Sequence, residues 1–147
     1  LKQNGLTIST AESCTGGLLA KRLTDIAGSS DVFIGSVIAY HNRIKTDFLG
    51  VYDEILNQFG AVSEETAAEM AKGIKNLFKT DIAVSVTGVA GPGGGSLEKP
   101  VGTVCFGFYI NNSIITKKKF IQGDRNRVRT FSSLYIINFL RKYLKSI

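Results

Sequence analysis

The eight residues Thr10-Ala11-Glu12-Ser13-Cys14-Thr15-Gly16-Gly17 join two segments that have different periodicities. The preceding run, Leu6 to Ser9, has the composition of a short buried strand. In the segment that follows, apolar residues recur at helical spacing as far as Gly28. The paired glycines permit a tight turn between the two segments. This order predicts a strand, a close turn and a helix, the unit from which α/β folds are built.

The rest of the chain continues this alternation of strands and helices. The patterns predict, in chain order, a strand over Phe33–Tyr40, a short helix capped by Asn42 and ended by Gly50, a helix capped by Ser63, a strand over Asp81–Thr87, a glycine-rich loop over Gly88–Pro100, a hairpin of strands Gly102–Ile110 and Ser113–Ile121 turned at Asn111-Asn112, and a helix over Arg125–Leu144. The helix after Ser63 carries an apolar stripe that we assign to the core, formed by Ala67, Met70, Ala71, Ile74 and Leu77. We therefore expect a three-layer α/β/α sandwich around a mixed, mostly parallel sheet of about five strands.

Length and composition limit the classes of protein to consider. With 147 residues, 44% of them hydrophobic and 20% charged, the chain suits one domain over residues 1–147 with a single core. No apolar run approaches the ~20 residues that cross a bilayer, so we expect no membrane partner. Cys14 and Cys105 lie far apart without metal-ligand spacing, which predicts a reduced, cytoplasmic protein with neither disulfide nor structural metal. Because the chain begins at Leu1, we expect a fragment that has a fused N-terminal domain in its native form.

Positive charge is concentrated in the last third of the chain. The net charge is +6, and residues 100–147 contain nine basic side chains and one acidic side chain, Asp124. Three of the basic residues, Arg125, Arg127 and Arg129, lie at the start of the last predicted helix, where backbone donors favour an anion. A phosphate site fits this arrangement. Aromatic residues are not interleaved with the charges, so we expect no nucleic-acid partner.

The turn after the first strand contains two candidate nucleophiles, Ser13 and Cys14. A serine needs a base, and the chain offers its only histidine, His41, or Lys45 as a buried neutral amine. A third pair would combine Cys14 with His41. Spacing alone leaves these three pairs open, and a pure binding loop is also compatible with a helix N-terminus.

The second glycine-rich segment, Val86 to Ser96, lacks the GxxxxGK[ST] pattern of a phosphate-binding loop and has no GxGxxG that opens a helix. The absence of these motifs therefore argues against a reaction on nucleoside triphosphates. The glycines follow a predicted strand, which is where ligands bind in open α/β sheets. We expect this segment to enclose a small ligand or to act as a mobile lid. Neither paired carboxylates nor an HExxH pattern indicates a metal centre.

Six short motifs occur in register along essentially the whole chain. They are Ala11-Glu-Ser-Cys-Thr-Gly-Gly17, Tyr40-x-Asn42-x-x-Lys45, Gly60-Ala-Val-Ser-Glu64, Val86-Thr-Gly-x-Ala-Gly-Pro92, Lys99-Pro-Val-Gly-Thr103 and Gly123-Asp-Arg125-x-x-Val-Arg129. Together they resemble the CinA C-terminal domain, the nicotinamide-nucleotide amidase (PncC) family. The resemblance implies an α/β/α fold, a homodimer, and hydrolysis of nicotinamide mononucleotide to nicotinate mononucleotide and ammonia without a metal or other cofactor.

The same resemblance assigns roles to residues. It implies Ser13 as the nucleophile and Lys45 as the base, with Tyr40 beside them, and it thereby disfavours His41, which departs from the small residue usual at that position. We expect a substrate-binding set of Cys14, Thr15, Gly16, Gly17, Asn42, Thr87, Gly88, Ala90, Gly91, Arg125 and Arg129. In this set Arg125 or Arg129 would bind the 5′-phosphate. The alternative function is a non-catalytic module that binds or senses a nucleotide.

Overall fold

The structure, a computed structural model, describes residues 1–146. Its sheet has the strand order β2-β1-β3-β4-β5 and is formed by β1 (Ile8–Glu12), β2 (Phe33–Ile38), β3 (Ile82–Gly88), β4 (Thr103–Ile110) and β5 (Ser113–Phe120). β1 pairs in parallel with both β2 and β3, whereas β4 pairs antiparallel with β3 and β5. The predicted mixed sheet of five strands is confirmed, with its parallel pairings confined to β2, β1 and β3.

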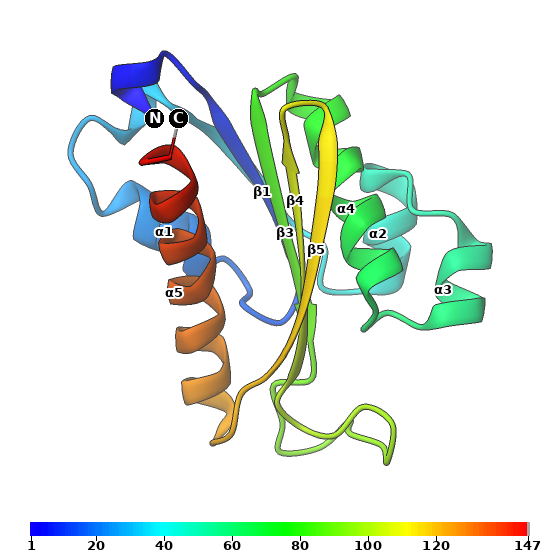
Figure 1. The fold of residues 1–147 in the computed structure, drawn as a ribbon. Helices are drawn as coiled ribbons and strands as arrows, with labels where there is room; N and C mark the ends of the chain where they lie inside the picture. The colour runs from blue at the N-terminus through cyan, green and yellow to red at the C-terminus, as the bar shows by residue number, and fades with distance from the viewer. Residues whose placement is uncertain (147) are drawn as a thin grey trace.

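Helices cover both faces of this sheet (Figure 1). One face carries α1 (Leu18–Thr24) and α5 (Arg125–Leu144), and the other carries α2 (Asn42–Leu49), α3 (Asp53–Phe59) and α4 (Glu64–Phe78). Two 3-10 turns, Lys2–Asn4 and Ser29–Asp31, complete the elements of residues 1–146. This arrangement confirms the three-layer α/β/α sandwich. None of the helices in the described part of the chain is both long enough and apolar enough to span a membrane.

The alternation of side chains along the strands divides the core into two apolar clusters. Ile8, Val84 and Phe106 belong to the cluster that packs against α1 and α5. Ala11 and Ala83, which alternate with them, belong to the cluster that packs against α2 and α4. The sheet is therefore apolar on both faces, as expected for a sheet covered by helices on both sides.

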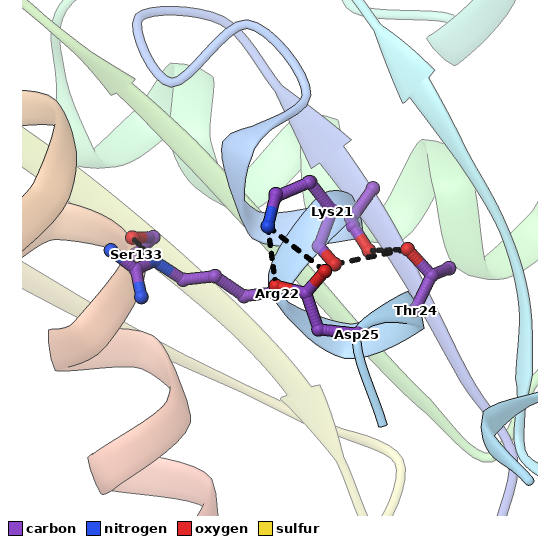
Figure 2. A network of polar contacts seen from close by, with 6 residues as sticks. Lys21, Arg22, Thr24, Asp25 and Ser133 are labelled. Atoms are coloured by element: carbon purple, nitrogen blue, oxygen red, sulfur yellow. Dashed lines mark hydrogen bonds and ion pairs between the residues drawn. The ribbon is translucent and has the colours of Figure 1, made fainter. Parts of the chain in front are cut away.

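A polar contact links the two helices of the first face. Arg22 of α1 donates from Nε to Ser133 Oγ of α5 at 2.8 Å, as Figure 2 shows. Neighbouring bonds stay within α1, where Lys21 Nζ contacts the Asp25 carboxylate at 2.9 and 2.6 Å. The link between Arg22 and Ser133 helps to hold α1, and the turn before it, against α5.

The first strand begins later and runs further than the predicted Leu6–Ser9. It continues through Thr10 to Glu12 because its polar side chains find buried partners. Ser9 Oγ lies 2.7 Å from Thr80 Oγ1, and Thr10 Oγ1 donates to Ser36 Oγ at 2.8 Å. Other boundaries also shift, since β2 ends at Ile38 and α1 at Thr24, earlier than predicted.

Two further differences concern the helices α2 and α3. The cap of α2 is His41, whose Nδ1 accepts from Arg43 N at 3.2 Å, so Asn42 is the first helical residue and not the cap as predicted. The sequence patterns did not predict α3, a helix of seven residues. The predicted cap Ser63 is confirmed, because its Oγ accepts from Thr66 N at 3.1 Å.

The predicted core stripe of α4 is correct except at its last member. Leu77 is 49% exposed, whereas Met70 and Ile74 are fully buried. Phe78 occupies the inward position instead, because the absence of a side chain at Gly35 of β2 lets its ring approach the sheet. The predicted hairpin turn is confirmed: Asn111 and Asn112 both have left-handed backbones, with φ of 50° and 57°.

Close contact between α2 and α4 depends on Gly73. A Cβ at this position would lie 1.9 Å from the carbonyl oxygen of Leu49, a backbone atom that cannot turn aside. We therefore expect Gly73→Ala to lower the free energy of unfolding by an amount at the upper end of the ~1–3 kcal/mol typical of overpacking. Chemical denaturation measures this change. Gly93→Ala is the matched control, since its Cβ would meet nothing within 4 Å, and equal losses in both variants would contradict the packing account.

Candidate active site

A cavity of about 270 Å³ lies at the ends of β1 and β3, where the backbone leaves the sheet. Parallel strands that end at the same edge of a sheet commonly form ligand sites there. The walls come from the turn after β1, the start of α2, the segment before α4, the loop after β3 and the start of α5. They consist of Ser13, Cys14, Tyr40, Asn42, Lys45, Ala61, Val62, Thr87, Gly88, Val89, Ala90, Gly91, Gly93, Gly94 and Arg125.

Ser13 is the first residue after β1 and is 8% exposed. Its backbone N–H donates to the carbonyl of Val86 in β3 at 2.9 Å, which fixes the residue to the central strand of the sheet. Its carbonyl accepts from Gly16 N at 3.0 Å and closes the turn. The Ser13 hydroxyl is therefore held at the cavity wall by a backbone that is bonded on both sides.

Lys45 brings a buried amine to the same wall. The residue lies in the first half of α2 and is only 1% exposed. Its Nζ is 3.2 Å from Ser13 Oγ and donates to the carbonyls of Ala39 at 2.9 Å and Tyr40 at 3.4 Å. No ion pair involving Lys45 occurs in residues 1–146. Burial without a counter-charge lowers the pKa of Lys45 below its ordinary 10.5.

The other two candidate pairs, Ser13 with His41 and Cys14 with His41, are not brought together in the cavity. His41 is exposed and uses its Nδ1 to cap α2, so its ring is not part of the cavity wall. Cys14 lines the cavity, but burial raises the pKa of its thiol to about 12, and the thiol therefore stays protonated at neutral pH. Among the three pairs that spacing left open, only Ser13 and Lys45 are brought together with the geometry of a nucleophile and a base.

Arg125 crosses the edge of the cavity from the start of α5. Its guanidinium donates to the carbonyl of Gly91 at 2.9 Å and to the hydroxyl of Tyr40 at 2.8 Å. It therefore connects the loop after β3 with the segment after β2. A guanidinium has five N–H donors, of which these contacts use two, so Arg125 retains donors for an anion.

The part of the wall near Ala61 follows a stretch of backbone that other side chains hold in place. The carbonyl of Ala61 accepts from Thr87 Oγ1 at 2.7 Å, and that of Gly60 accepts from Thr66 Oγ1 at 2.7 Å. Lys99 Nζ donates to the carbonyl of Phe59. Three consecutive carbonyls are thus bonded to side chains from three other segments, which makes this wall a fixed surface.

Not every residue of the predicted site reaches the cavity. Those on its wall are Ser13, Cys14, Tyr40, Asn42, Lys45, Thr87, Gly88, Ala90, Gly91 and Arg125. Thr15, Gly16 and Gly17 belong to the turn but do not line the cavity, and Arg129 does not line it either. Thr15 and Gly17 face the buried Glu12 carboxylate, and Arg129 contacts backbone carbonyls of the turn.

Sequence reasoning missed the contribution of Ala61, Val62, Val89, Gly93 and Gly94 to the wall. Their side chains carry no chemistry that a sequence pattern would reveal. Two signals were present: the motif Gly60–Glu64, which the resemblance included without a role, and the glycine-rich segment Val86 to Ser96, which was expected to enclose a ligand or to act as a lid. No group of three or more His, Cys, Asp or Glu residues that could hold a metal ion occurs in residues 1–146.

Comparison with known proteins places this arrangement in a family. The model of the CinA C-terminal domain matches residues 1–144. A CinA-like protein of Kosmotoga olearia is 52% identical over 144 residues, which are 98% of this chain and 35% of that protein. A CinA-like protein of Dictyoglomus turgidum is 48% identical over 98% of this chain and 35% of its own length. The chain thus spans about a third of the curated relatives that it matches.

Solved structures give the same result. A competence/damage inducible protein from Agrobacterium tumefaciens superimposes with a TM-score of 0.91 at 44% identity, covering 95% of this chain and 86% of the other. The competence damage-inducible protein A of Klebsiella pneumoniae gives a TM-score of 0.94 at 36% identity, covering 97% and 89%. At these identities both the fold and the family are shared.

Burial of Lys45 leads to a stability prediction. Between the lowered pKa of folded Lys45 and 10.5, the unfolded chain binds a proton that the folded chain does not, so this residue makes stability rise with pH. Lys45→Met removes that dependence. We expect the difference in free energy of unfolding, variant minus wild type, to be greatest near neutral pH. This difference should fall as the pH approaches 10.5.

Urea unfolding at a series of pH values measures the difference. Lys142→Met is the matched control, because it replaces an exposed lysine of α5 and should follow the wild type across the range. A difference between Lys45→Met and the wild type that does not vary with pH would show that Lys45 is charged in the folded protein.

Proposed function

Because this chain belongs to the CinA C-terminal domain family, we propose that it is an amidohydrolase that deamidates nicotinamide mononucleotide through a Ser13–Lys45 pair. The observation that carries the proposal is the buried Lys45 amine 3.2 Å from Ser13 Oγ. The choice of nicotinamide mononucleotide rests on the motifs that resemble the nicotinamide-nucleotide amidase family. No metal or organic cofactor takes part in the proposed reaction.

The contacts of Lys45 support a role as general base. A neutral amine has two hydrogens and one lone pair, and the carbonyls of Ala39 and Tyr40 accept the two hydrogens. The lone pair then faces the Ser13 hydroxyl, which donates its proton to Nζ. A base can act only when it is unprotonated, so the lowered pKa of Lys45 increases the active fraction near neutral pH.

Acylation follows from this pairing. Ser13 Oγ forms a bond to the carboxamide carbon as its proton passes to Lys45 Nζ, and the amide oxygen takes up the negative charge. The C–N bond then breaks while the Lys45 ammonium returns a proton to the nitrogen, and ammonia leaves. A water molecule, deprotonated by Lys45, attacks the ester in the same way, releasing the carboxylate and restoring the Ser13 hydroxyl.

The developing oxyanion needs backbone donors, and the turn leaves few of them free. The N–H of Gly16 bonds Ser13, and the N–H of Gly17 bonds Glu12. Within residues 1–146 the N–H groups of Cys14 and Thr15 have no backbone or carboxylate acceptor, and of these two residues only Cys14 lines the cavity. We assign Cys14 N–H to the oxyanion, where one such donor is commonly worth about 3 kcal/mol of transition-state stabilisation.

The charge of the cavity supports an anionic substrate. Arg125 is a fixed positive charge on the wall, and none of the lining residues is Asp or Glu. Of the two arginines that the resemblance offers for the 5′-phosphate, Arg125 is the one on the wall, so we assign the phosphate to Arg125. The homodimer implied by the resemblance stays a prediction.

The first test addresses the catalytic pair. We expect Ser13→Ala and Lys45→Met each to lower ammonia release from nicotinamide mononucleotide about a thousandfold or more, and the double variant to be little worse, because the two residues act as one unit. Cys14→Ala and His41→Asn should retain most activity, since Asn can still cap α2. If Cys14→Ala lost ammonia release while Ser13→Ala kept it, the Ser13–Lys45 pair would be wrong and a thiol mechanism would take its place. Nucleotide binding without ammonia release by the wild type would support the non-catalytic alternative.

The second test addresses the phosphate. Arg125→Ala should raise the KM for nicotinamide mononucleotide by at least about tenfold, with little effect on the phosphate-free riboside, because a phosphate contact contributes mostly uniform binding. Arg127→Ala is the control, since Arg127 lies on the same helix but contacts Phe131 outside the cavity. Equal losses on nucleotide and riboside in Arg125→Ala would assign Arg125 to the fold of the cavity edge.

A further inference from the structure

Glu12 is a fully buried carboxylate that the proposed reaction does not use. It is the last residue of β1 and accepts four hydrogen bonds. Oε2 accepts from Thr15 Oγ1 at 2.7 Å and from the N–H groups of Gly17 and Leu19 at 3.0 Å each. Oε1 accepts from Ala20 N at 2.7 Å. All four donors belong to the turn after Ser13 or to the first turn of α1.

These bonds replace an ordinary helix cap. The residue before α1 is Gly17, with φ of 96° and no side chain, so it cannot cap the helix. Glu12 supplies the missing acceptor from the strand. No ion pair in residues 1–146 involves Glu12, so the donors of the turn and of α1 are its partners. The strand end and the helix start are thereby joined around the Ser13 turn.

Arg129 of α5 holds the opposite side of the same turn. Its Nε donates to the carbonyl of Cys14 at 3.2 Å and its NH2 group to the carbonyl of Thr15 at 2.9 Å. Gly16, which has a left-handed backbone with φ of 57°, lies directly beside this guanidinium. Glu12 thus bonds N–H groups of Gly17 and of the first turn of α1, and Arg129 bonds two carbonyls of the turn.

We propose that Glu12 and Arg129 are positioning residues that fix the turn carrying Ser13, so that its Oγ stays within reach of Lys45. This inference rests on the proposed function only for the identity of the reaction. Neither side chain lines the cavity, so neither is expected to touch the substrate. A displacement of about 1 Å at a nucleophile can cost on the order of a hundredfold in rate. Arg129 is thereby assigned to the turn and not to the phosphate.

The two side chains predict a common kinetic signature. Glu12→Gln keeps the shape of the side chain but replaces one acceptor oxygen with an NH2 donor, which faces N–H donors of the turn or of α1. Arg129→Met removes the contacts with the carbonyls of Cys14 and Thr15. Each should lower kcat for nicotinamide mononucleotide about a hundredfold while changing the KM less than about twofold. The loss on the riboside should be the same. Arg129→Lys, which keeps one donor group, should recover part of the rate, and the exposed Arg141→Met should match the wild type.

A second readout does not depend on the natural substrate. Labelling of Ser13 by a fluorophosphonate, followed by intact mass spectrometry, reports the reactivity of the nucleophile alone. Both variants should label at a rate reduced by a similar factor, measured on protein shown by its unfolding curve to be folded. If the wild type labels rapidly but releases no ammonia from the nucleotide, the proposed substrate fails while the positioning inference is still tested.

Three outcomes would overturn the inference. One is labelling within about twofold of the wild type in both Arg129→Met and Arg129→Lys. Another is a raised KM for the nucleotide with an unchanged riboside reaction in Arg129→Met, which would return Arg129 to the phosphate. The third is a lower unfolding midpoint with unchanged labelling of the folded protein, which would make the contacts structural only. If Glu12→Gln does not fold, the two Arg129 variants decide the question.

Discussion

The placement of an amine in the interior without a counter-charge is the constraint on which the site depends. Lys45 gives up hydration, and the only compensation is a set of neutral oxygens from Ser13, Ala39 and Tyr40. Such an environment favours an uncharged amine. The carbonyls of Ala39 and Tyr40 belong to the short segment between β2 and α2, so the point at which α2 begins brings them and the amine together. The His41 cap fixes that starting point.

A second constraint acts on the nucleophile. The turn after β1 is held by Val86 of β3 at its start, by the Glu12 carboxylate beneath it and by the Arg129 guanidinium behind it. These contacts come from the sheet and from both helices of one face. The proposed base, Lys45, comes in contrast from α2 on the other face. The cavity lies at the ends of the parallel strands, and its wall takes residues from helices on both faces of the sheet.

Periodicity predicted the order of the strands and of every α-helix except α3, because it reports which side of each element is buried. It misplaced the end of β1, since Thr10 and Glu12 resemble turn residues until their buried partners are known. It left the base open because spacing along the chain gives no distance across the fold. It could not separate Arg125 from Arg129, because they lie one turn apart on α5. Arg125 lines the cavity, whereas Arg129 contacts carbonyls of the turn after β1. The roles of Ala61 and Val62 were hidden because their side chains carry no reactive or charged group.

The most direct test of the central claim is the protonation state of Lys45 itself. NMR titration of the protein labelled with 13C at lysine Cε follows this amine without reference to any substrate, and Lys45→Met identifies its resonance. The account predicts a Lys45 resonance that titrates clearly below 10.5 and that is distinct from the resonances of the exposed lysines. A Lys45 resonance that titrates at or above 10.5 would show a charged amine beside Ser13 and would contradict a Ser13–Lys45 mechanism.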